Sequence, residues 1–221
     1  MEDGFLMINV IYEDNHLLVV EKPINIPVQE DESKDEDLLN ILKKYLKEKY
    51  NKPGNVYLGL VHRLDRPVGG VMVFAKTSKA ASRLSDQVRT HKFEKKYYAV
   101  VEGHATGGKL VDKLYKDTKT NTTIVDDRGK ESILNYELVK YKDNMSLVDI
   151  SLETGRSHQI RVQFSSRKLP LFGDQRYNKN AKVGEQIALF AYYLSFVHPV
   201  TKEKMEFRLD LPKRYPWNLF E

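Results

Sequence analysis

The sequence predicts an α+β fold built on a largely antiparallel, mixed sheet with flanking helices and loops. Candidate strands outnumber candidate helices, and most strands follow one another through short turns. Short connections favour hairpins, whereas neighbouring parallel strands need a long crossover. With 221 residues, 41% of them hydrophobic, the chain can bury a substantial core. No Gly/Ser/Pro-rich linker divides it, so we expect one domain over residues 1–221, which could form two lobes flanking a cleft.

The first part of the chain is predicted to contain strands over residues 9–12, 17–20 and 71–76. Leucine and isoleucine recur at helical spacing within residues 36–50, which predicts an amphipathic helix. Ser78 is a typical N-capping residue and predicts a second helix that extends to about residue 90. Residues 30–37 carry six acidic residues and one lysine, so we expect a solvated loop there.

The second part is predicted to consist mainly of strands, over residues 95–101, 133–141, 146–152, 187–196 and 204–209. The last four are expected to form two hairpins. Ser157 is expected to cap a helix that carries Ile160, Arg161 and Phe164. Residues 116–130 are rich in Thr, Asn, Asp and Lys and are expected to form a mobile hairpin or loop.

Composition excludes several classes of function. Without cysteine, the chain has no disulfide, no thiolate nucleophile and no cysteine-ligated metal. Its six histidines lack the spacing of a helix-borne zinc site, and it has no Walker-type phosphate loop or nucleophile elbow. No apolar run approaches the ~20 residues of a membrane span, and Met1-Glu2-Asp3-Gly4 lacks the basic start of a secretion signal. We therefore expect a cytoplasmic, membrane-free protein without metal or other cofactor.

Positive charge is concentrated in one stretch. Residues 76–96 carry seven Lys or Arg and two Asp or Glu, and the rest of the chain is balanced. Such a patch is typical of a phosphate-binding surface, although a solvated helix face gives the same pattern. The position of the patch beside the motif at residues 62–65 favours phosphate binding.

His62-Arg63-Leu64-Asp65 is the most informative motif. It lies between two apolar runs, so Asp65 is expected at the end of a strand, where a carboxylate needs a partner or a function. Arg66 follows at once, and Gly155-Arg156-Ser157-His158-Gln159-Ile160-Arg161 supplies further arginines. Taken alone, Asp65 fits an ordinary turn aspartate, and Arg161 fits a surface ion pair. One ionised carboxylate held by arginine in a basic chain indicates a nucleophile or base that acts on a polyanion.

These motifs resemble the signature of the RluA-type RNA pseudouridine synthases. Blocks in the order of that family cover most of residues 10–211, namely residues 96–103, 154–162, 170–177 and 194–199. The resemblance implies the pseudouridine synthase catalytic fold, with a central cleft, and the isomerisation of a specific uridine in structured ribosomal or transfer RNA by base flipping. It implies no cofactor, and we expect a monomer without an obligate protein partner.

The resemblance also assigns roles. It implies that Asp65 is the nucleophile, that Tyr97 packs on the target base and that Arg161 pairs with Asp65. Taken alone, Tyr97 fits a core aromatic residue. The remaining RNA-binding residues are expected to be Arg63, His62, Arg66, Lys76, Lys92, Lys95, Lys96, Arg156, His158 and Gln159.

The chain departs from the family pattern in three places. Val68-Gly69-Gly70 stands where Thr-Ser-Gly is common, and Gln163 stands where a histidine is common. The catalytic signature begins almost at once, so we expect a variant that lacks the family's N-terminal RNA-binding domain. Two alternatives stay open: a catalytically inactive RNA-binding or RNA-folding protein, and a hydrolytic enzyme that acts on nucleosides or sugars.

Overall fold

The computed structural model describes residues 8–221, so the predicted absence of a secretion signal at Met1–Gly4 concerns residues outside the described part. The chain forms two compact units. The first unit comprises the described residues up to Phe93 together with Tyr193–Leu209, and the second comprises Glu94–Tyr192 and Asp210–Glu221. None of the helices described is long and apolar enough to span a membrane.

The first unit is built on antiparallel strands. Its strand order is β1 (Asn9–Glu13), β2 (Leu17–Lys22), β4 (Gly69–Ala75) and β10 (Leu189–Val197), and β10 continues into this unit from the second one. The short strand β3 (Gly59–Leu60) pairs with β4, and β11 (Lys204–Arg208) pairs with β10. Every residue of β4 and nearly all of β2 are buried, which explains their continuous apolar sequences.

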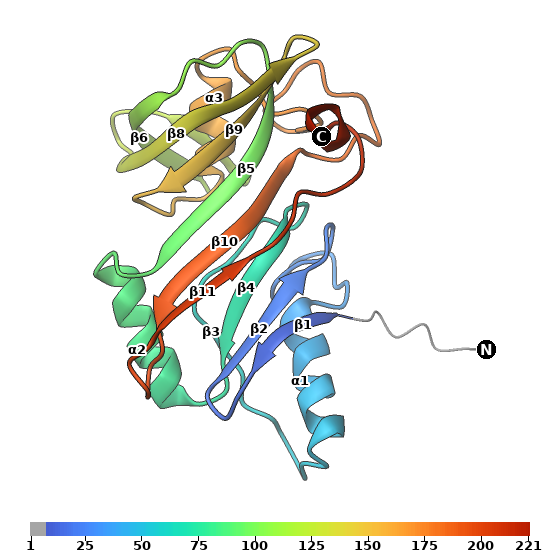
Figure 1. Cartoon of the computed structure of the whole chain (residues 1–221), viewed down its shortest axis with the longest axis vertical. Coiled ribbons are helices and arrows are strands. Elements are labelled where there is room, and N and C mark those ends of the chain that lie inside the picture. The colour runs from blue at the N-terminus through green and yellow to red at the C-terminus, as the bar shows by residue number, and fades with distance from the viewer. Residues whose placement is uncertain (1–7) are drawn as a thin grey trace, which may run out of the picture. The chain divides into compact units, whose positions relative to one another are not determined.

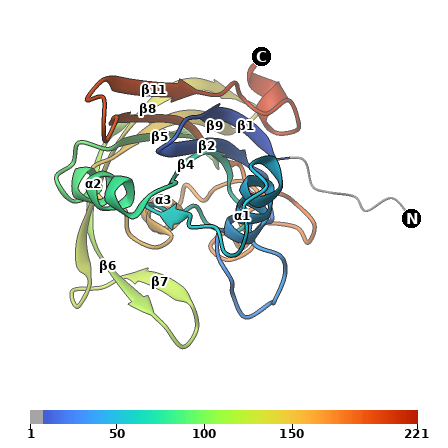
Figure 2. The ribbon, with the colours of Figure 1, turned by 90° about the horizontal axis from the view of Figure 1, so that it is seen from below.

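Two amphipathic helices complete the first unit, and Figures 1 and 2 show α1 near β1 and β2. Helix α1 (Leu38–Lys49) begins after Asp37, whose carboxylate accepts the Asn40 amide hydrogen at 2.9 Å. Helix α2 (Ser78–Arg89) is capped by Thr77, whose hydroxyl accepts from the Ala80 amide. The predicted cap at Ser78 was therefore one residue late, since Ser78 is already helical. Ala80 and Leu84 of α2 are buried against the strands.

The second unit has the strand order β10, β5 (Glu94–Glu102), β9 (Met145–Leu152), β8 (Lys130–Lys142), β6 (Gly108–Asp117) and β7 (Thr122–Val125). The predicted β8–β9 hairpin is confirmed, because the two strands pair in an antiparallel register. Residues 116–130 were expected to be a mobile hairpin or loop, and the hairpin is confirmed, because they contain the end of β6 and the whole of β7 in a regular antiparallel pairing. Figure 2 shows these two strands side by side.

Helix α3 (Gln159–Ser165) is short and largely buried. The predicted cap at Ser157 was wrong, because the helix begins after His158, which has a left-handed backbone with φ of 53° and makes no side-chain capping bond. All six residues from Gln159 to Phe164 are buried, so even the charged residue of this helix is enclosed. Phe164 packs edge-on against Tyr136 of β8, with ring centroids 4.9 Å apart.

The predicted fold class is confirmed. Residues 8–221 combine a large, mostly antiparallel sheet with three α-helices, and the 3₁₀ helix η1 (Trp217–Phe220) lies near the C-terminus.

Candidate functional site

Asp65 lies on a tight turn of the first unit, between β3 and β4. Its carbonyl accepts the Val68 amide hydrogen at 2.9 Å, which closes the turn. Leu64 and Val68 on either side are buried, whereas Asp65 is half-buried. The backbone of the turn is thus fixed by its own hydrogen bond and by two apolar anchors, while the residue as a whole keeps partial exposure.

Lys22, at the end of β2, stabilises this turn through hydrogen bonds to its backbone. Its ammonium donates to three carbonyl oxygens, those of Pro23 at 2.9 Å, Arg66 at 2.9 Å and Val68 at 2.8 Å. The side chain is only 1% exposed. Burial lowers the pKa of Lys22 to about 7, although the negative charge of Asp65 opposes this shift. Lys22 therefore supplies both the hydrogen bonds that fix the turn and a positive charge that acts on Asp65.

The glycines that follow the turn permit close packing. A side-chain carbon at Gly69 would lie 3.2 Å from the Lys22 carbonyl oxygen and from a methyl group of Ile24. Gly70 has a φ of 134°, which favours glycine. The departure from the family pattern at Gly69 therefore accompanies a close approach of β4 to the end of β2.

The first residue of the motif has a structural role. The His62 side chain is 8% exposed, and its Nε2 accepts the Val73 amide hydrogen at 3.1 Å. Its ring meets Phe93 edge-on at 5.0 Å between centroids. We expected His62 to contact RNA, but the structure places it in the core, where it supports β4.

Arg63 and Arg66 are both exposed, as expected for residues that contact RNA. Arg66 is nevertheless engaged within the protein. It donates to the Ser33 hydroxyl at 2.8 Å and forms ion pairs with Asp31 and Asp35 of the acidic loop. These carboxylates, chiefly Asp35, raise the pKa of the Arg66 guanidinium.

The basic stretch at residues 76–96 does not form one free surface. Lys76 is enclosed, with its ammonium 2.8 Å from Glu13 and 2.6 Å from the Asp14 carbonyl oxygen. Burial lowers the pKa of Lys95, and Lys96 lies 3.6 Å from Glu94. Lys92 is exposed. The charge count along the sequence overestimated the exposed positive charge of this stretch, because Lys76 and Lys96 lie beside acidic residues and Lys95 is partly buried.

In the second unit, Arg161 is buried on α3 and held by a carboxylate. Its Nε and Nη2 atoms donate to the two oxygens of Asp174 at 2.9 and 2.7 Å, which is the bidentate geometry that a guanidinium favours. Arg161 is 6% exposed and Asp174 is 1% exposed. The guanidinium carbon also lies 5.1 Å from the centroid of the Tyr177 ring. Arg161 is therefore fixed by an ion pair and an aromatic ring of its own unit.

Tyr97 is a buried residue of β5, paired in register with Ile150 of β9. Its neighbour Tyr98 points to the opposite face of the sheet, because side chains alternate along a strand. Tyr98 stacks on Tyr192 at 3.9 Å, and the Tyr192 hydroxyl donates to Asp149. The sequence could not distinguish these two adjacent tyrosines by environment.

The other predicted residues of the second unit lie around the start of α3. Gln159 is buried, and its side-chain oxygen accepts from the Thr154 hydroxyl and the Arg156 amide at 2.9 and 3.0 Å. Arg156 is exposed and donates to the Glu131 carbonyl at 3.1 Å. His158 Nδ1 lies 2.6 Å from the Tyr177 hydroxyl. Gln159 therefore shapes the loop before α3.

Gln163 fits the position where the family commonly has a histidine. It is fully buried, and its side-chain nitrogen donates to Asp112 at 2.7 Å and to the Ser132 carbonyl at 3.2 Å. A primary amide supplies two donors, whereas a neutral imidazole supplies one. Gln163 can therefore link α3 to both β6 and β8.

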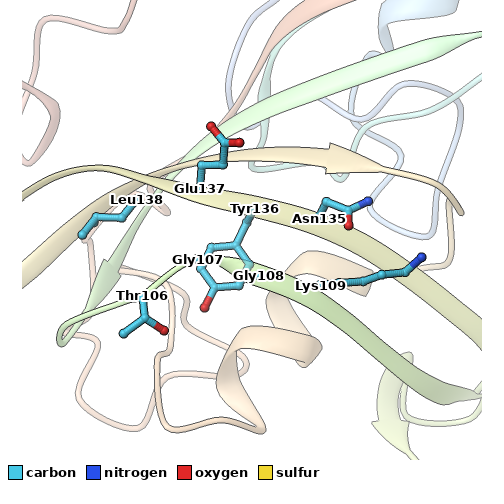
Figure 3. A pocket seen from close by; sticks show the side chains of 8 residues that line it. All are labelled: Thr106, Gly107, Gly108, Lys109, Asn135, Tyr136, Glu137 and Leu138. Atoms are coloured by element: carbon cyan, nitrogen blue, oxygen red, sulfur yellow. The ribbon is translucent and has the colours of Figure 1, made fainter.

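A pocket of the second unit lies apart from these residues. It measures about 510 Å³ and is lined by residues 106–109 and 135–138. Figure 3 shows Glu137 and Leu138 pointing away from Lys109 and Asn135. Lys109 and Asn135 both bind Glu153, at 3.1 and 2.8 Å. This pocket includes none of the predicted site residues, and its polar groups do not converge. Nor do any three His, Asp or Glu side chains among residues 8–221 cluster in a way that could hold a metal ion.

Comparison with known proteins decides the family. Residues 16–166 match the family model described as RNA pseudouridylate synthase. This chain belongs to that family. RNA pseudouridine synthases are isomerases that act on RNA, and the predicted enzyme class is confirmed.

Relatives of this pseudouridine synthase align over nearly its whole length. Ribosomal large subunit pseudouridine synthase D of Zymomonas mobilis is 33% identical over 93% of this chain and 70% of its own length. An uncharacterized RNA pseudouridine synthase of Aquifex aeolicus is 36% identical over 94% of this chain and 71% of its own length. The solved structure of human RNA pseudouridylate synthase domain containing 4 is 21% identical, with a TM-score of 0.78 over 93% of this chain and 89% of that one, and it shares the fold.

Sequence reasoning missed three residues that shape these sites, namely Lys22, Asp174 and Tyr177. Lys22 and Asp174 each carry a charge next to an apolar run, which is the signal that could have found them. Tyr177 gave no comparable signal. Its partners are Thr123 and His158, the residue before α3, and the sequence does not show this proximity.

Proposed function

We propose that this enzyme isomerises a uridine of ribosomal large-subunit RNA, with Asp65 as the nucleophile and Tyr97 and Arg161 serving the same uridine. The choice of ribosomal over transfer RNA is supported by several relatives that are named ribosomal large subunit pseudouridine synthase D. The catalytic domain is proposed to span residues 1–221.

The reaction keeps the atoms of the substrate and needs no redox partner. The bond between uracil N1 and ribose C1′ breaks, the base turns, and a bond forms between C5 and C1′. The proton lost from C5 is balanced by the one that N1 gains. The base must leave the helical stack first, at a cost of a few kcal/mol. Stacking on an aromatic side chain such as Tyr97 can recover about 1–3 kcal/mol.

The single observation that carries the proposal is the setting of Asp65. A nucleophile must be both fixed and reachable. The Asp65–Val68 turn is closed by a 2.9 Å hydrogen bond and held by Lys22, while the Asp65 side chain stays half-buried. The turn of an ordinary surface aspartate would not require hydrogen bonds from a buried ammonium such as that of Lys22.

Replacement of Asp65 by asparagine tests the role of the nucleophile. Asp65→Asn is expected to keep RNA affinity and to lose pseudouridine formation by a factor on the order of 10³ or more, because an amide is a poor nucleophile. Pseudouridine can be mapped on large-subunit RNA and on transfer RNA in parallel. Asp86→Asn, on the exposed face of α2, is the matched control and should stay active.

Three outcomes would count against the proposal. Retained activity of Asp65→Asn would remove Asp65 as the nucleophile. If the wild type modified transfer RNA alone, ribosomal RNA would not be its substrate. RNA binding without modification of any cellular RNA by the wild type would favour the inactive RNA-binding alternative.

A second experiment tests whether the three residues act together. Groups that act on one reacting centre lose activity in a strongly non-additive way. The double variant Asp65→Asn with Arg161→Lys is expected to be no slower than the slower single variant. Additive losses would show that Arg161 serves another purpose.

A further inference from the structure

The segment Gly173–Tyr177 forms a turn that is organised around Asp174. Besides Arg161, the Asp174 carboxylate accepts the amide hydrogens of Arg176 at 3.0 Å and Tyr177 at 3.2 Å. Gly173 has a φ of 69°, and a side-chain carbon there would lie 2.4 Å from the Gln186 carbonyl oxygen. The Asp174 carboxylate therefore fixes both the buried guanidinium of Arg161 and the backbone of Arg176 and Tyr177.

Arg176 and Tyr177 both form hydrogen bonds with the β6–β7 hairpin. The Tyr177 hydroxyl accepts the Thr123 amide hydrogen of β7 at 2.8 Å. The Arg176 guanidinium donates to the carbonyls of Thr120 and Asn121 in the hairpin turn. The hairpin is thus attached through its backbone to the segment that positions Arg161.

Tyr177 has two further contacts on its other sides. Its hydroxyl lies 2.6 Å from His158 Nδ1, at the residue before α3, and its ring lies under the Arg161 guanidinium at 5.1 Å. Burial raises the pKa of Tyr177, so the phenol keeps its proton at neutral pH. Since the oxygen already accepts from Thr123, that proton can be donated to His158. One side chain therefore contacts the hairpin, the start of α3 and the buried arginine.

We propose that Tyr177 is a positioning residue that couples the β6–β7 hairpin to Arg161. The hydroxyl docks β7 and His158, and the ring supports the guanidinium. The hairpin presents Lys113, Lys116, Ile124 and Val125 to solvent, so an RNA that rests on it would act through Tyr177 on Arg161. This inference rests on the proposed function of Arg161 in catalysis.

The two parts of the side chain can be separated by two variants. Tyr177→Phe keeps the ring and removes the hydroxyl. It is expected to raise KM for RNA roughly three- to tenfold and to leave kcat within about twofold, because the hydroxyl contacts with the hairpin and His158 are lost while the ring still supports Arg161. Tyr177→Leu also removes the ring and is expected to lower kcat by roughly tenfold more, because a guanidinium over an aromatic ring is stabilised by that contact.

Hydrogen exchange tests the docking directly in the free enzyme. The Thr123 amide is expected to exchange faster in Tyr177→Phe than in the wild type. Tyr193→Phe is the matched control, because it removes a phenol hydroxyl that bonds to Glu206 in the first unit. Its Thr123 exchange, KM and kcat should match the wild type.

Unchanged Thr123 exchange and KM in Tyr177→Phe would overturn the coupling. If Tyr177→Leu does not fold, the phenylalanine variant still decides the role of the hydroxyl. The exchange measurement needs neither RNA nor catalysis. A failed Asp65→Asn experiment together with faster exchange would therefore overturn the proposed nucleophile and leave the docking role of Tyr177 standing.

Discussion

Asp65 and Arg161 are held in opposite ways, one by backbone contacts and the other by side chains. The Asp65 turn is fixed through carbonyl oxygens that converge on the Lys22 ammonium, and Asp65 itself is half-buried. Arg161 is almost fully buried and is fixed by the Asp174 carboxylate and the Tyr177 ring. A nucleophile needs an open side chain, so the fold holds its backbone. A guanidinium is charged at any physiological pH, so burying it requires a counter-charge.

Removal of Asp174 should give the largest effect. Asp174→Ala leaves the Arg161 guanidinium buried without its bidentate partner, which is expected to cost about 3–5 kcal/mol of unfolding free energy. Urea denaturation of the two proteins measures this difference. Asp86→Ala, which removes an exposed ion pair with Arg89, is the control and should cost less than about 1 kcal/mol. Equal costs in the two variants would show that Arg161 does not depend on Asp174.

Replacement of Lys22 should give a smaller loss of stability and a clear loss of turnover. Lys22→Met removes the donor for three carbonyls, so a cost of roughly 3 kcal/mol is expected. The Asp65 turn should loosen, which lowers kcat more than RNA affinity. Lys44→Met, which breaks an exposed pair with Glu36, is the comparison variant. If kcat stays at the wild-type value, the turn is held by its own hydrogen bond alone.

The pH dependence of stability isolates the charge of Lys22. Burial lowers its pKa to about 7, whereas the unfolded chain should titrate near the ordinary value of 10.5. Between these values the unfolded state binds more protons than the folded state, so raising the pH favours folding. Relative to Lys22→Met, the wild type should therefore gain roughly 2 kcal/mol of stability between pH 7 and pH 9. Parallel stability curves for the two proteins would refute a buried, titrating ammonium.

Arg66 should show the smallest effect on stability. Its ion pairs with Asp31 and Asp35 are exposed to solvent, so Arg66→Ala should cost less than about 1 kcal/mol. If the guanidinium leaves these carboxylates to bind an RNA phosphate, the variant should also reduce the slope of log affinity against log salt by about 1. Lys44→Ala is the control for nonspecific charge loss. A salt slope equal to the wild type would assign Arg66 to the acidic loop alone.

Local patterns predicted much of this fold. Continuous apolar runs located β2 and β4, and helical spacing located α1. Alternation located the β8–β9 hairpin, whose antiparallel pairing is confirmed. The start of α3 was missed, because its N-cap residue is His158, which is not one of the residue types preferred at a helix start and makes no capping bond. Strand β6 was missed because its polar residues gave weak alternation.

The candidate site, like the fold, was predicted only in part from the sequence. The motif at residues 62–65 and the order of the blocks around it determined the family, and the family model confirms it. The distribution of charge in space could not be predicted. Lys76 belongs to a basic stretch of the sequence but pairs with Glu13 in the structure. His62 belongs to the signature motif but lies in the core.

The sequence by itself determined which elements form and which chemistry the chain carries, because helix and strand periods and signature motifs are properties of neighbouring residues. Only the tertiary structure decided which charges are buried and what holds them. Lys22 meets the carbonyls of Arg66 and Val68, and Tyr177 meets the Thr123 amide, each across more than forty residues of chain. Contacts of that range depend on how strands pair and helices pack, and each buried polar group takes the partner that folding brings to it.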